Sequence, residues 1–276
     1  MTFLYERSYR GKVQAALLDW AGTTMDFGCV APAVVFVKVF ERAGVPISIE
    51  EARVPMGAHK RVHIQKVTQI DAVKQRWQAK YGRPPAEEDV NRMFADFVPL
   101  QLDCLSDYSD LIPGTLEVVA ALRARGIKIG STTGYLREMM EINLRDAKRQ
   151  GYEQDSTVCA SDVPAGRPYP YMCLQNVINL QVSPVEACVK IDDTIPGIEE
   201  GLNAGMWTIG LAVSCNEVGL SLKDWTALPE AEKQLRRQRG YDRMRKGGAH
   251  YVVDMIADIL PCVDDIEARL ARGEKP

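Results

Sequence analysis

The chain has 276 residues, a formal net charge of −3 at pH 7, 46% hydrophobic residues and 26% charged residues. This length and composition are those of a globular protein with a sizeable buried core. The small negative charge argues against a general affinity for nucleic acid or anionic membranes. No apolar run of the sequence approaches the roughly 20 residues of a membrane-spanning helix.

Cysteine usage and the first residues of the chain indicate a compartment. Seven cysteines occur without a C-x-x-C pair, which favours reduced, buried thiols. The polar segment 1–12 has no apolar signal-peptide core. We therefore expect a cytoplasmic protein. Three histidines without metal-ligand spacing argue against a zinc site.

A short apolar run over residues 15–19 predicts a buried strand that ends in Asp19. Gly22 and two threonines follow, which indicates a sharp turn at the edge of a sheet. Glycine lets the backbone approach an anion, and N–H groups in such a turn attract phosphate. We interpret Asp19 as a nucleophile. A strand that merely ends in a capping aspartate is the alternative.

Four helices are expected next, and no convincing strand lies between about residue 26 and residue 106. Helical periodicity covers 29–43, 50–56, 59–80 and 87–105. This all-helical block interrupts the chain just after its first strand. We therefore predict an inserted helical domain over 26–105 and an α/β core domain formed by 1–25 and 106–276.

Strands and helices alternate in the rest of the chain, which favours a parallel, doubly wound sheet. Strands are expected over 127–131, 157–160, 188–192, 206–213 and 250–254, and helices over 115–125, 138–150, 171–179, 195–204 and 255–272. A turn is expected at 132–134. Basic residues gather in 214–248, but acidic residues balance them. We interpret this segment as a solvated helical excursion rather than a phosphate or nucleic-acid patch.

Reactive side chains follow four of the expected strands. They are Asp19, Thr133, Arg167 and the pair Asp192-Asp193. Because the carboxyl ends of parallel strands lie along one edge of a sheet, we expect these residues to converge. A nucleophilic carboxylate, a hydroxyl, a guanidinium and an acidic pair suit phosphoryl transfer, and such oxygen ligands favour Mg²⁺.

Taken together, these features resemble the haloacid dehalogenase superfamily over essentially the whole chain. The resemblance implies a Rossmann-like α/β core and makes the helical block its cap domain. Most phosphatases of this superfamily carry a second aspartate two residues after the nucleophile, as general acid and base. Ala21 stands at that position here, and it cannot protonate the leaving group of an ester.

The cap supplies another kind of reactive group. Lys60 and His63 share one face of the expected helix over 59–80. A lysine that loses its proton can form a Schiff base with a carbonyl compound, and the iminium then serves as an electron sink. Combined with the first motif, this pattern resembles the phosphonatase family. The resemblance rests on the segments 19–24, 28–29, 56–57 with Lys60 and His63, 131–135, 166–168, 193–194 and 203–207.

The phosphonatase resemblance implies hydrolysis of the C–P bond of phosphonoacetaldehyde to acetaldehyde and phosphate, in 2-aminoethylphosphonate degradation. Lys60 would form the imine, and Asp19 would receive the phosphoryl group. It also implies Mg²⁺ as cofactor and a homodimer formed through the cap. The implied site residues are Asp19, Lys60 and His63 for catalysis; Met56, Gly57, Thr133 and Arg167 for substrate and phosphate; and Asp19, the Ala21 carbonyl and Asp193 for the metal.

The acidic residues leave two assignments open. The superfamily often has a second acidic residue about four positions beyond the motif's aspartate, but Gly197 stands there. Asp192, Glu199 or water could take its place. We favour Asp193 over Asp192 as the metal ligand, because it directly precedes Thr194.

Three further side chains near the motifs have competing interpretations. We favour His63 over His59 as the proton carrier. For Cys29, packing of the cap helix is favoured over a nucleophilic thiol, because no histidine stands at a recognisable spacing. Tyr135 either reaches the site or simply packs.

Two other functions fit parts of the pattern. One is an ester phosphatase or phosphomutase of the same superfamily, against which Ala21 argues. The other is a non-catalytic phospholigand-binding protein that merely retains the fold. Asp19 and Lys60 together argue against it, because binding alone needs neither a nucleophile nor an imine-forming amine.

Overall fold

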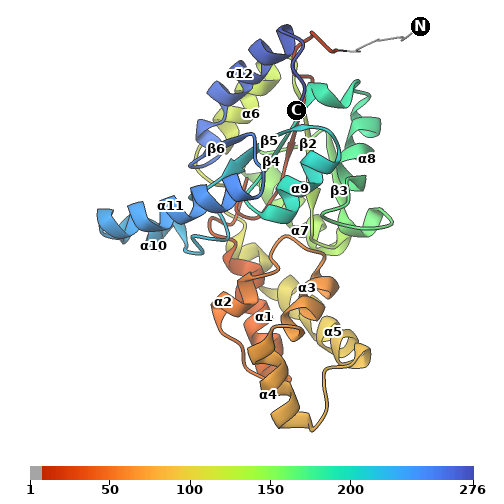
Figure 1. Ribbon diagram of the computed structural model, residues 1–276, viewed down its shortest axis with the longest axis vertical. Helices are drawn as coiled ribbons and strands as arrows, with labels where there is room; N and C mark the ends of the chain where they lie inside the picture. Colours follow the sequence, from red (N-terminus) through yellow and green to blue (C-terminus); the bar gives the residue numbers. More distant parts are fainter. Residues whose placement is uncertain (1–7) are drawn as a thin grey trace, which may run out of the picture.

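A six-stranded sheet forms the centre of the structure, a computed structural model that describes residues 8–276 (Figure 1). The strand order is β3-β2-β1-β4-β5-β6, and each pairing along it is parallel. The strands are β1 (Ala15–Leu18), β2 (Lys128–Thr133), β3 (Ser156–Cys159), β4 (Cys188–Asp192), β5 (Trp207–Leu211) and β6 (Tyr251–Val253). The expected parallel α/β fold is confirmed. Residues 1–7 of the expected core domain lie outside the described residues.

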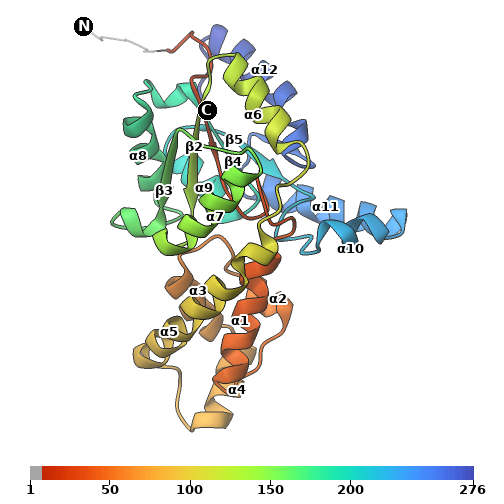
Figure 2. The same ribbon diagram turned by 180° about the vertical axis from the view of Figure 1, so that it is seen from behind.

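Helices cover both faces of the sheet. Six of them are α6 (Thr115–Ala124), α7 (Arg137–Arg149), α8 (Tyr171–Leu180), α9 (Ile195–Asn203), α11 (Glu230–Lys246) and α12 (Leu260–Ala271). In β1, Ala15 and Leu17 pack with α8, whereas Ala16 and Leu18 belong to the apolar cluster of α6, α7 and α12. Figures 1 and 2 show these two layers from opposite sides. Alternate strand residues point to opposite faces, so a strand in a sheet covered on both faces buries both sets, as in β1, whose four apolar residues are all buried.

The inserted helices form a separate lobe beyond the carboxyl ends of the strands (Figure 1). They are α1 (Val30–Arg42), α2 (Ile49–Arg53), α3 (Lys60–Thr68), α4 (Asp71–Tyr81) and α5 (Glu87–Cys104). Their apolar stripes bury Phe36, Trp77 and Phe97 completely. Helix α5 packs against both α1 and α3, so the lobe has an interior of its own.

The two chain segments that connect the lobe to the sheet run side by side. Met25, which follows β1, forms an antiparallel bridge with Leu111. The amide of Asp26 donates to the carbonyl of Asp110 at 3.2 Å, and that of Ile112 donates to Thr24 at 2.9 Å. The chain therefore leaves the core and returns to it at one place.

The helix expected over 59–80 is wrong as a single element, because α3 and α4 are separated at Gln69 and Ile70. The Thr68 hydroxyl bonds back to the preceding turn, and the amides of Gln69 and Ile70 bond only three residues back. Such tightening ends an α-helix. The helical spacing of apolar residues does not reveal this break, because α4 begins only two residues after α3 and buries an apolar face of its own.

Two other expectations need correction, and a third is confirmed. Thr132 and Thr133 belong to β2 rather than to the turn after it. The helix expected over 255–272 begins as a 3₁₀ turn, and α12 starts at Leu260 with Pro261 in its first turn, where a missing N–H costs little. The segment 214–248 contains α10 (Leu222–Ala227) and α11 as expected helices. Both helices are largely exposed, as expected, and α11 packs Met244 against β5.

Among the described residues, no helix is both long and apolar enough to cross a membrane.

Candidate active site

A small cavity of about 20 Å³ lies between the sheet and the lobe. Both parts of the molecule line it. The expected site residues that line it are Asp19, Ala21, Met56, Gly57, Lys60, Thr133 and Arg167. Residues distant in sequence thus converge at the carboxyl ends of the strands, as the topology requires. His63 is not among the lining residues, and Asp193 lies at the edge of a neighbouring cavity.

Asp19 lies directly after β1 and faces Arg167. Its amide continues the ladder by donating to the Ile191 carbonyl at 3.0 Å, which fixes the start of the turn. The Arg167 Nη2 donates to Asp19 Oδ1 at 2.6 Å. Burial raises the pKa of Asp19, while Arg167 acts against this shift. The carboxylate is therefore held in a fixed position by a full positive charge.

Arg167 is itself fixed by groups that the sequence did not indicate. Its Nε donates to Glu200 Oε2 at 3.0 Å, and its Nη2 also donates to the hydroxyl of Thr132 at 2.9 Å. Although burial opposes it, the charges of Asp19, Asp192 and Glu200 raise the pKa of Arg167 well above its usual range. The guanidinium stays charged and cannot rotate freely.

The turn after Asp19 packs against Asp193. Gly22 has φ of +85°, and a Cβ there would overlap the Asp193 carboxylate. Only glycine combines this backbone conformation with such a close approach. The Thr24 hydroxyl donates to the Asp19 carbonyl at 3.0 Å and closes the turn.

The two acidic residues after β4 have different environments. Asp192 is saturated: Lys190 Nζ donates to its Oδ2 at 2.6 Å, and the amide and hydroxyl of Thr194 donate to its Oδ1. Although burial opposes it, Arg167 and Lys190 lower the pKa of Asp192. In Asp193, Oδ2 accepts from the Asn216 amide at 2.9 Å, whereas the buried Oδ1 has no partner among the described residues.

This arrangement suits a divalent cation. Oxygen atoms of Asp19, Asp192 and Asp193 lie within 4.8 Å of one another, and all three residues are buried. Burial raises the pKa of Asp193 well above its usual range, and the charges of Asp19 and Asp192 raise it further. A cation relieves such crowding of carboxylates. The unpartnered Asp193 Oδ1 is the atom that it would bind.

Cys29 lies beside the same carboxylate. Its single S–H faces two acceptors, the Ala21 carbonyl at 3.0 Å and Asp193 Oδ2 at 3.2 Å. Burial and the nearby carboxylates raise the pKa of this thiol well above its usual range. A protonated thiol is a poor nucleophile, which agrees with the packing role favoured from the sequence.

The missing acidic residue at position 197 has a structural counterpart. A Cβ on Gly197 would overlap the carboxylate of Asp192. The Asp192 side chain therefore fills the space that a side chain at 197 would occupy. Glu199 is exposed on the outer side of α9 and lies away from the site, so it is not the substitute.

Lys60 is the first residue of α3 and is only 5% exposed. Its Nζ lies 4.4 Å from the centroid of the Tyr135 ring and 5.9 Å from that of Phe36. Burial lowers the pKa of Lys60 to about 8. The positive end of the α3 dipole acts in the same direction. Tyr135 thus reaches the site rather than packing elsewhere.

His63 lies behind the cavity, inside the lobe. Its ring stacks on Phe36 with a centroid separation of 3.6 Å, and its Nε2 lies 2.7 Å from the Ala52 carbonyl and donates to it. Burial lowers the pKa of His63 well below its usual range, so the ring is neutral. Its Nδ1 has no partner among the described residues. The competing His59 accepts from the Arg61 amide and caps α3.

Sequence reasoning missed Lys190, Glu200 and the part played by Thr132. A signal existed for Lys190, which stands between the apolar Val189 and Ile191 in the middle of β4. A lysine that is fully buried needs a carboxylate partner, and Asp192 is the nearest along the strand. No comparable signal marks Glu200, because a glutamate within a helix is ordinarily exposed.

Comparisons with known proteins agree with this geometry. A family model described as haloacid dehalogenase-like hydrolase matches residues 13–205. The phosphonoacetaldehyde hydrolase of Hahella chejuensis is 48% identical over 100% of this chain and 94% of its own length. That of Klebsiella pneumoniae is 49% identical over 96% of this chain and 99% of its own. A crystal structure of a phosphonoacetaldehyde hydrolase-like protein from Oleispira antarctica superposes with a TM-score of 0.97, at 45% identity over 100% of both chains.

The fold and the family model place the chain among the haloacid dehalogenase-like hydrolases. Identities of 46–49% over nearly the full length of several relatives define the family more narrowly. The chain belongs to the phosphonoacetaldehyde hydrolase family, and it is a hydrolase.

Proposed function

We propose that this protein hydrolyses the C–P bond of phosphonoacetaldehyde to acetaldehyde and phosphate, within the degradation of 2-aminoethylphosphonate. One observation carries the proposal. A lysine with a pKa lowered to about 8 by burial lines the same cavity as a carboxylate held by an arginine. Imine chemistry and phosphoryl transfer can therefore act on the two ends of one small molecule.

The first step forms an imine on Lys60. The neutral amine adds to the aldehyde carbon, and loss of water gives a protonated imine. Tyr135 and Phe36 surround Nζ and keep solvent from the amine. Met56 packs with Cys29 beside the cavity and limits the space around the imine.

The second step transfers the phosphoryl group. An Asp19 oxygen attacks phosphorus, the C–P bond breaks, and its electron pair enters the iminium to give an enamine. Arg167 and Thr133 line the cavity beside Asp19 and would hold the phosphoryl oxygens. Water then hydrolyses the aspartyl phosphate. Protonation of the enamine carbon and hydrolysis of the imine release acetaldehyde and free Lys60.

His63 remains our proposed proton carrier, although it does not line the cavity. It is neutral, and its Nδ1, which has no partner among the described residues, is the atom that would take up a proton. Direct contact with substrate is not needed for that role.

Mg²⁺ is the proposed cofactor. Asp19, the Ala21 carbonyl and Asp193 would hold it, and when bound it supplies positive charge to the phosphoryl oxygens and to Asp19. The residues fit, because Asp193 offers an unpartnered buried oxygen to hard cations.

Two features of organisation belong to the same proposal. We propose that the helical lobe is a cap domain with the bounds 26–105, and that two copies of the chain associate through it.

An ester phosphatase is the second candidate, but the cavity shows no general acid at position 21, where Ala21 stands.

The test joins product assay and covalent trapping. With phosphonoacetaldehyde and Mg²⁺ the protein should release acetaldehyde and phosphate in equal amounts. Borohydride should trap an adduct that mass spectrometry places on Lys60, and Lys60→Arg should abolish it. Lys66→Arg is the matched control, because Lys66 is an exposed lysine of the same helix. An adduct on Lys66, or none at all, would exclude the imine mechanism.

The nucleophile is tested in the same system. Asp19→Ala should still form the Lys60 adduct but should lose turnover by about 10⁴-fold or more, as expected when a nucleophile is removed. Turnover of Asp19→Ala close to that of the unmodified protein would disprove the aspartyl phosphate. Faster release of phosphate from simple phosphate esters than from phosphonoacetaldehyde would favour the ester phosphatase.

A further inference from the structure

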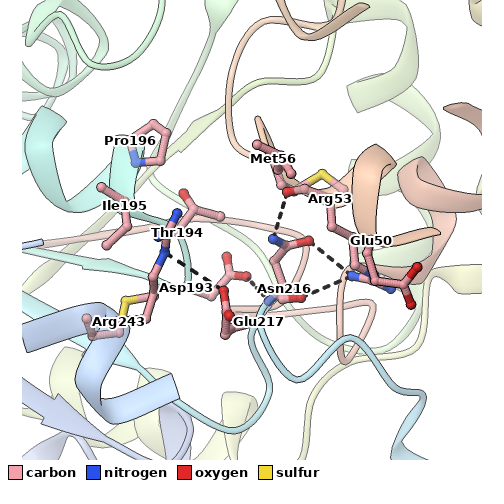
Figure 3. Close-up of a pocket in the computed structure, with 12 residues that line it drawn as sticks. Glu50, Arg53, Met56, Asp193, Thr194, Ile195, Pro196, Asn216, Glu217 and Arg243 are labelled. Atoms are coloured by element: carbon pink, nitrogen blue, oxygen red, sulfur yellow. Dashed lines mark hydrogen bonds and ion pairs between the residues drawn. The ribbon is translucent and has the colours of Figure 1, made fainter. Parts of the chain in front are cut away.

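Asn216 connects the helical lobe to Asp193. This residue lies in the loop after β5, outside both groups of motifs. Its backbone N–H donates to Asp193 Oδ2 at 2.9 Å. Its side-chain Nδ2 donates to the Arg53 carbonyl at 3.1 Å, and its Oδ1 accepts from the Arg53 guanidinium at 3.0 Å (Figure 3).

Arg53, at the end of α2, directs its guanidinium toward the boundary between the lobe and the core. Its Nη1 donates to the Gly28 carbonyl at 2.7 Å and its Nη2 to the Gly219 carbonyl at 3.0 Å. Gly28 is itself tied to this loop, because its amide donates to the Ser214 carbonyl at 2.8 Å. One arginine therefore joins α2, the linker before α1 and the loop 214–219.

The contact lies where the two parts must separate. The active-site cavity of about 20 Å³ holds roughly one water molecule, so a phosphonate with an aldehyde arm cannot enter it as it stands. A larger cavity of about 330 Å³ adjoins it, lined by α2 on one side and by Asp193 and α11 on the other (Figure 3). Admission of substrate needs more space than this arrangement gives, and a movement of the lobe away from the core would break the Arg53–Asn216 contact.

We propose that Asn216 is a positioning residue that aligns Asp193 for the cation when Arg53 holds it, so that closure of the lobe completes the metal site. This inference rests on the proposed role of Asp193 as a cation ligand. The Asn216 backbone N–H occupies Oδ2, whereas Oδ1 has no partner within residues 8–276 and is left for the cation. Partners that orient a metal ligand typically change metal affinity by about 10- to 100-fold when lost.

The experiment uses the full-length protein and Mg²⁺ alone, without phosphonoacetaldehyde. Calorimetry should show that Asn216→Ala and Arg53→Lys each bind Mg²⁺ about tenfold more weakly. Hydrogen exchange should become faster at residues 214–220 in both variants. Lysine at position 53 can reach only part of the acceptors that a planar guanidinium reaches.

Arg76→Lys is the matched control. Arg76 also bonds several acceptors, but all of them lie in the lobe: the carbonyls of Ala72 and Pro46, and the carboxylate of Glu51. Its replacement should loosen the lobe without changing Mg²⁺ affinity or exchange at 214–220. A loss of affinity as large as in Arg53→Lys would overturn the inference.

The outcomes separate this inference from the proposed function. Wild-type Mg²⁺ affinity in both Asn216→Ala and Arg53→Lys would refute the positioning role and leave the hydrolase activity untouched. If Asn216→Ala does not fold, Arg53→Lys alone decides, because it alters only the lobe side of the contact. Failure of the unmodified protein to bind Mg²⁺ would remove both the cofactor and this inference.

Discussion

Lys60 shows how burial changes a reactive amine whose Nζ makes no hydrogen bond to a carboxylate of the described residues. Among the described residues, no carboxylate hydrogen-bonds its Nζ, and aromatic rings face it instead. Desolvation then dominates and lowers the pKa of Lys60 to about 8. The neutral amine that imine formation requires is therefore present in substantial amount near neutral pH.

This pKa predicts the pH dependence of imine formation. Below about pH 8 the neutral fraction of Lys60 falls about tenfold per pH unit. The rate of borohydride trapping with phosphonoacetaldehyde should fall in the same way from about pH 8 to about pH 6, and should level off above pH 8. A trapping rate with a midpoint near the ordinary lysine pKa of about 10.4 would show that Lys60 is not desolvated.

The same shift predicts an effect on stability. Unfolded lysine has a pKa of about 10.4, so folded Lys60 binds its proton less readily than the unfolded chain does. Below about pH 8 the folded protein contains Lys60 in its charged form, and this buried charge lowers the free energy of unfolding. The destabilisation disappears as the pH rises from about 8 to about 10.4. Lys60→Met should raise the free energy of unfolding by about 3 kcal/mol at pH 7 and much less at pH 10. Denaturant unfolding at both values measures it, and equal effects would contradict the desolvation argument.

At the scale of elements, the buried acid at the junction of β4 and α9 comes from the strand and not from the helix. The carboxylate comes from Asp192, at the end of the strand, and fills the space next to Gly197 on the helix. Lys190 and Arg167 compensate its charge. The chain thus keeps a buried acid at this point by exchanging a side chain at position 197 of the helix for one at the end of the strand.

This exchange predicts strong coupling between the two positions. Gly197→Asp should destabilise the protein, because its carboxylate and that of Asp192 would compete for one space and for the charges of Lys190 and Arg167. Asp192→Gly should also destabilise it, because Lys190 and Arg167 lose a partner. The double variant should recover stability, with a coupling energy of about 1–3 kcal/mol in a denaturant cycle. Additive effects would mean that the two side chains do not share the space.

Most elements were predictable because their signals are local. Apolar runs gave the strands, and periodicity with glycine or proline at the ends gave the helices. The break between α3 and α4 was not, since the apolar spacing continues across Ile70. Among the site residues, Asp19 and Arg167 follow strands and could be placed by topology. Glu200 could not, because only the folded helix shows that it points inward.

His63 shows a different limit of sequence reasoning. Its spacing from Lys60 correctly puts both side chains in the buried part of α3. The spacing could not show that Phe36, from α1, would cover the ring. Contacts between helices depend on packing partners distant in sequence, and no periodicity records them.

At the scale of the whole molecule, the site exists only where the two parts touch. Gly57, with φ of +90°, lies against Thr194 of the core, and a Cβ there would come within 2.5 Å of the Thr194 hydroxyl. The absence of a side chain at this point lets the lobe approach close enough to bring Lys60 to Asp19.

Gly57→Ala should therefore hold the parts apart. A displacement of about 1 Å costs about 100-fold in rate, so kcat/KM for acetaldehyde release should fall by about that factor. Gly82→Ala is the control. Gly82 also has positive φ and lies in the lobe, but nothing stands within 4 Å of its Cβ position. Gly82→Ala should introduce the same backbone strain in the lobe as Gly57→Ala but keep full activity. Equal losses of kcat/KM in the two variants would mean that backbone strain alone causes the effect.

The paired linkers at Met25 and Leu111 have a consequence for the history and engineering of such a chain. For the sheet, the segment between Met25 and Leu111 is one long loop whose two ends are held together by their pairing. The entropic cost of a loop rises only with the logarithm of its length. The sheet can therefore carry a large insertion, exchange it or lose it with little effect on its own folding, while the insertion covers the cavity beside Asp19.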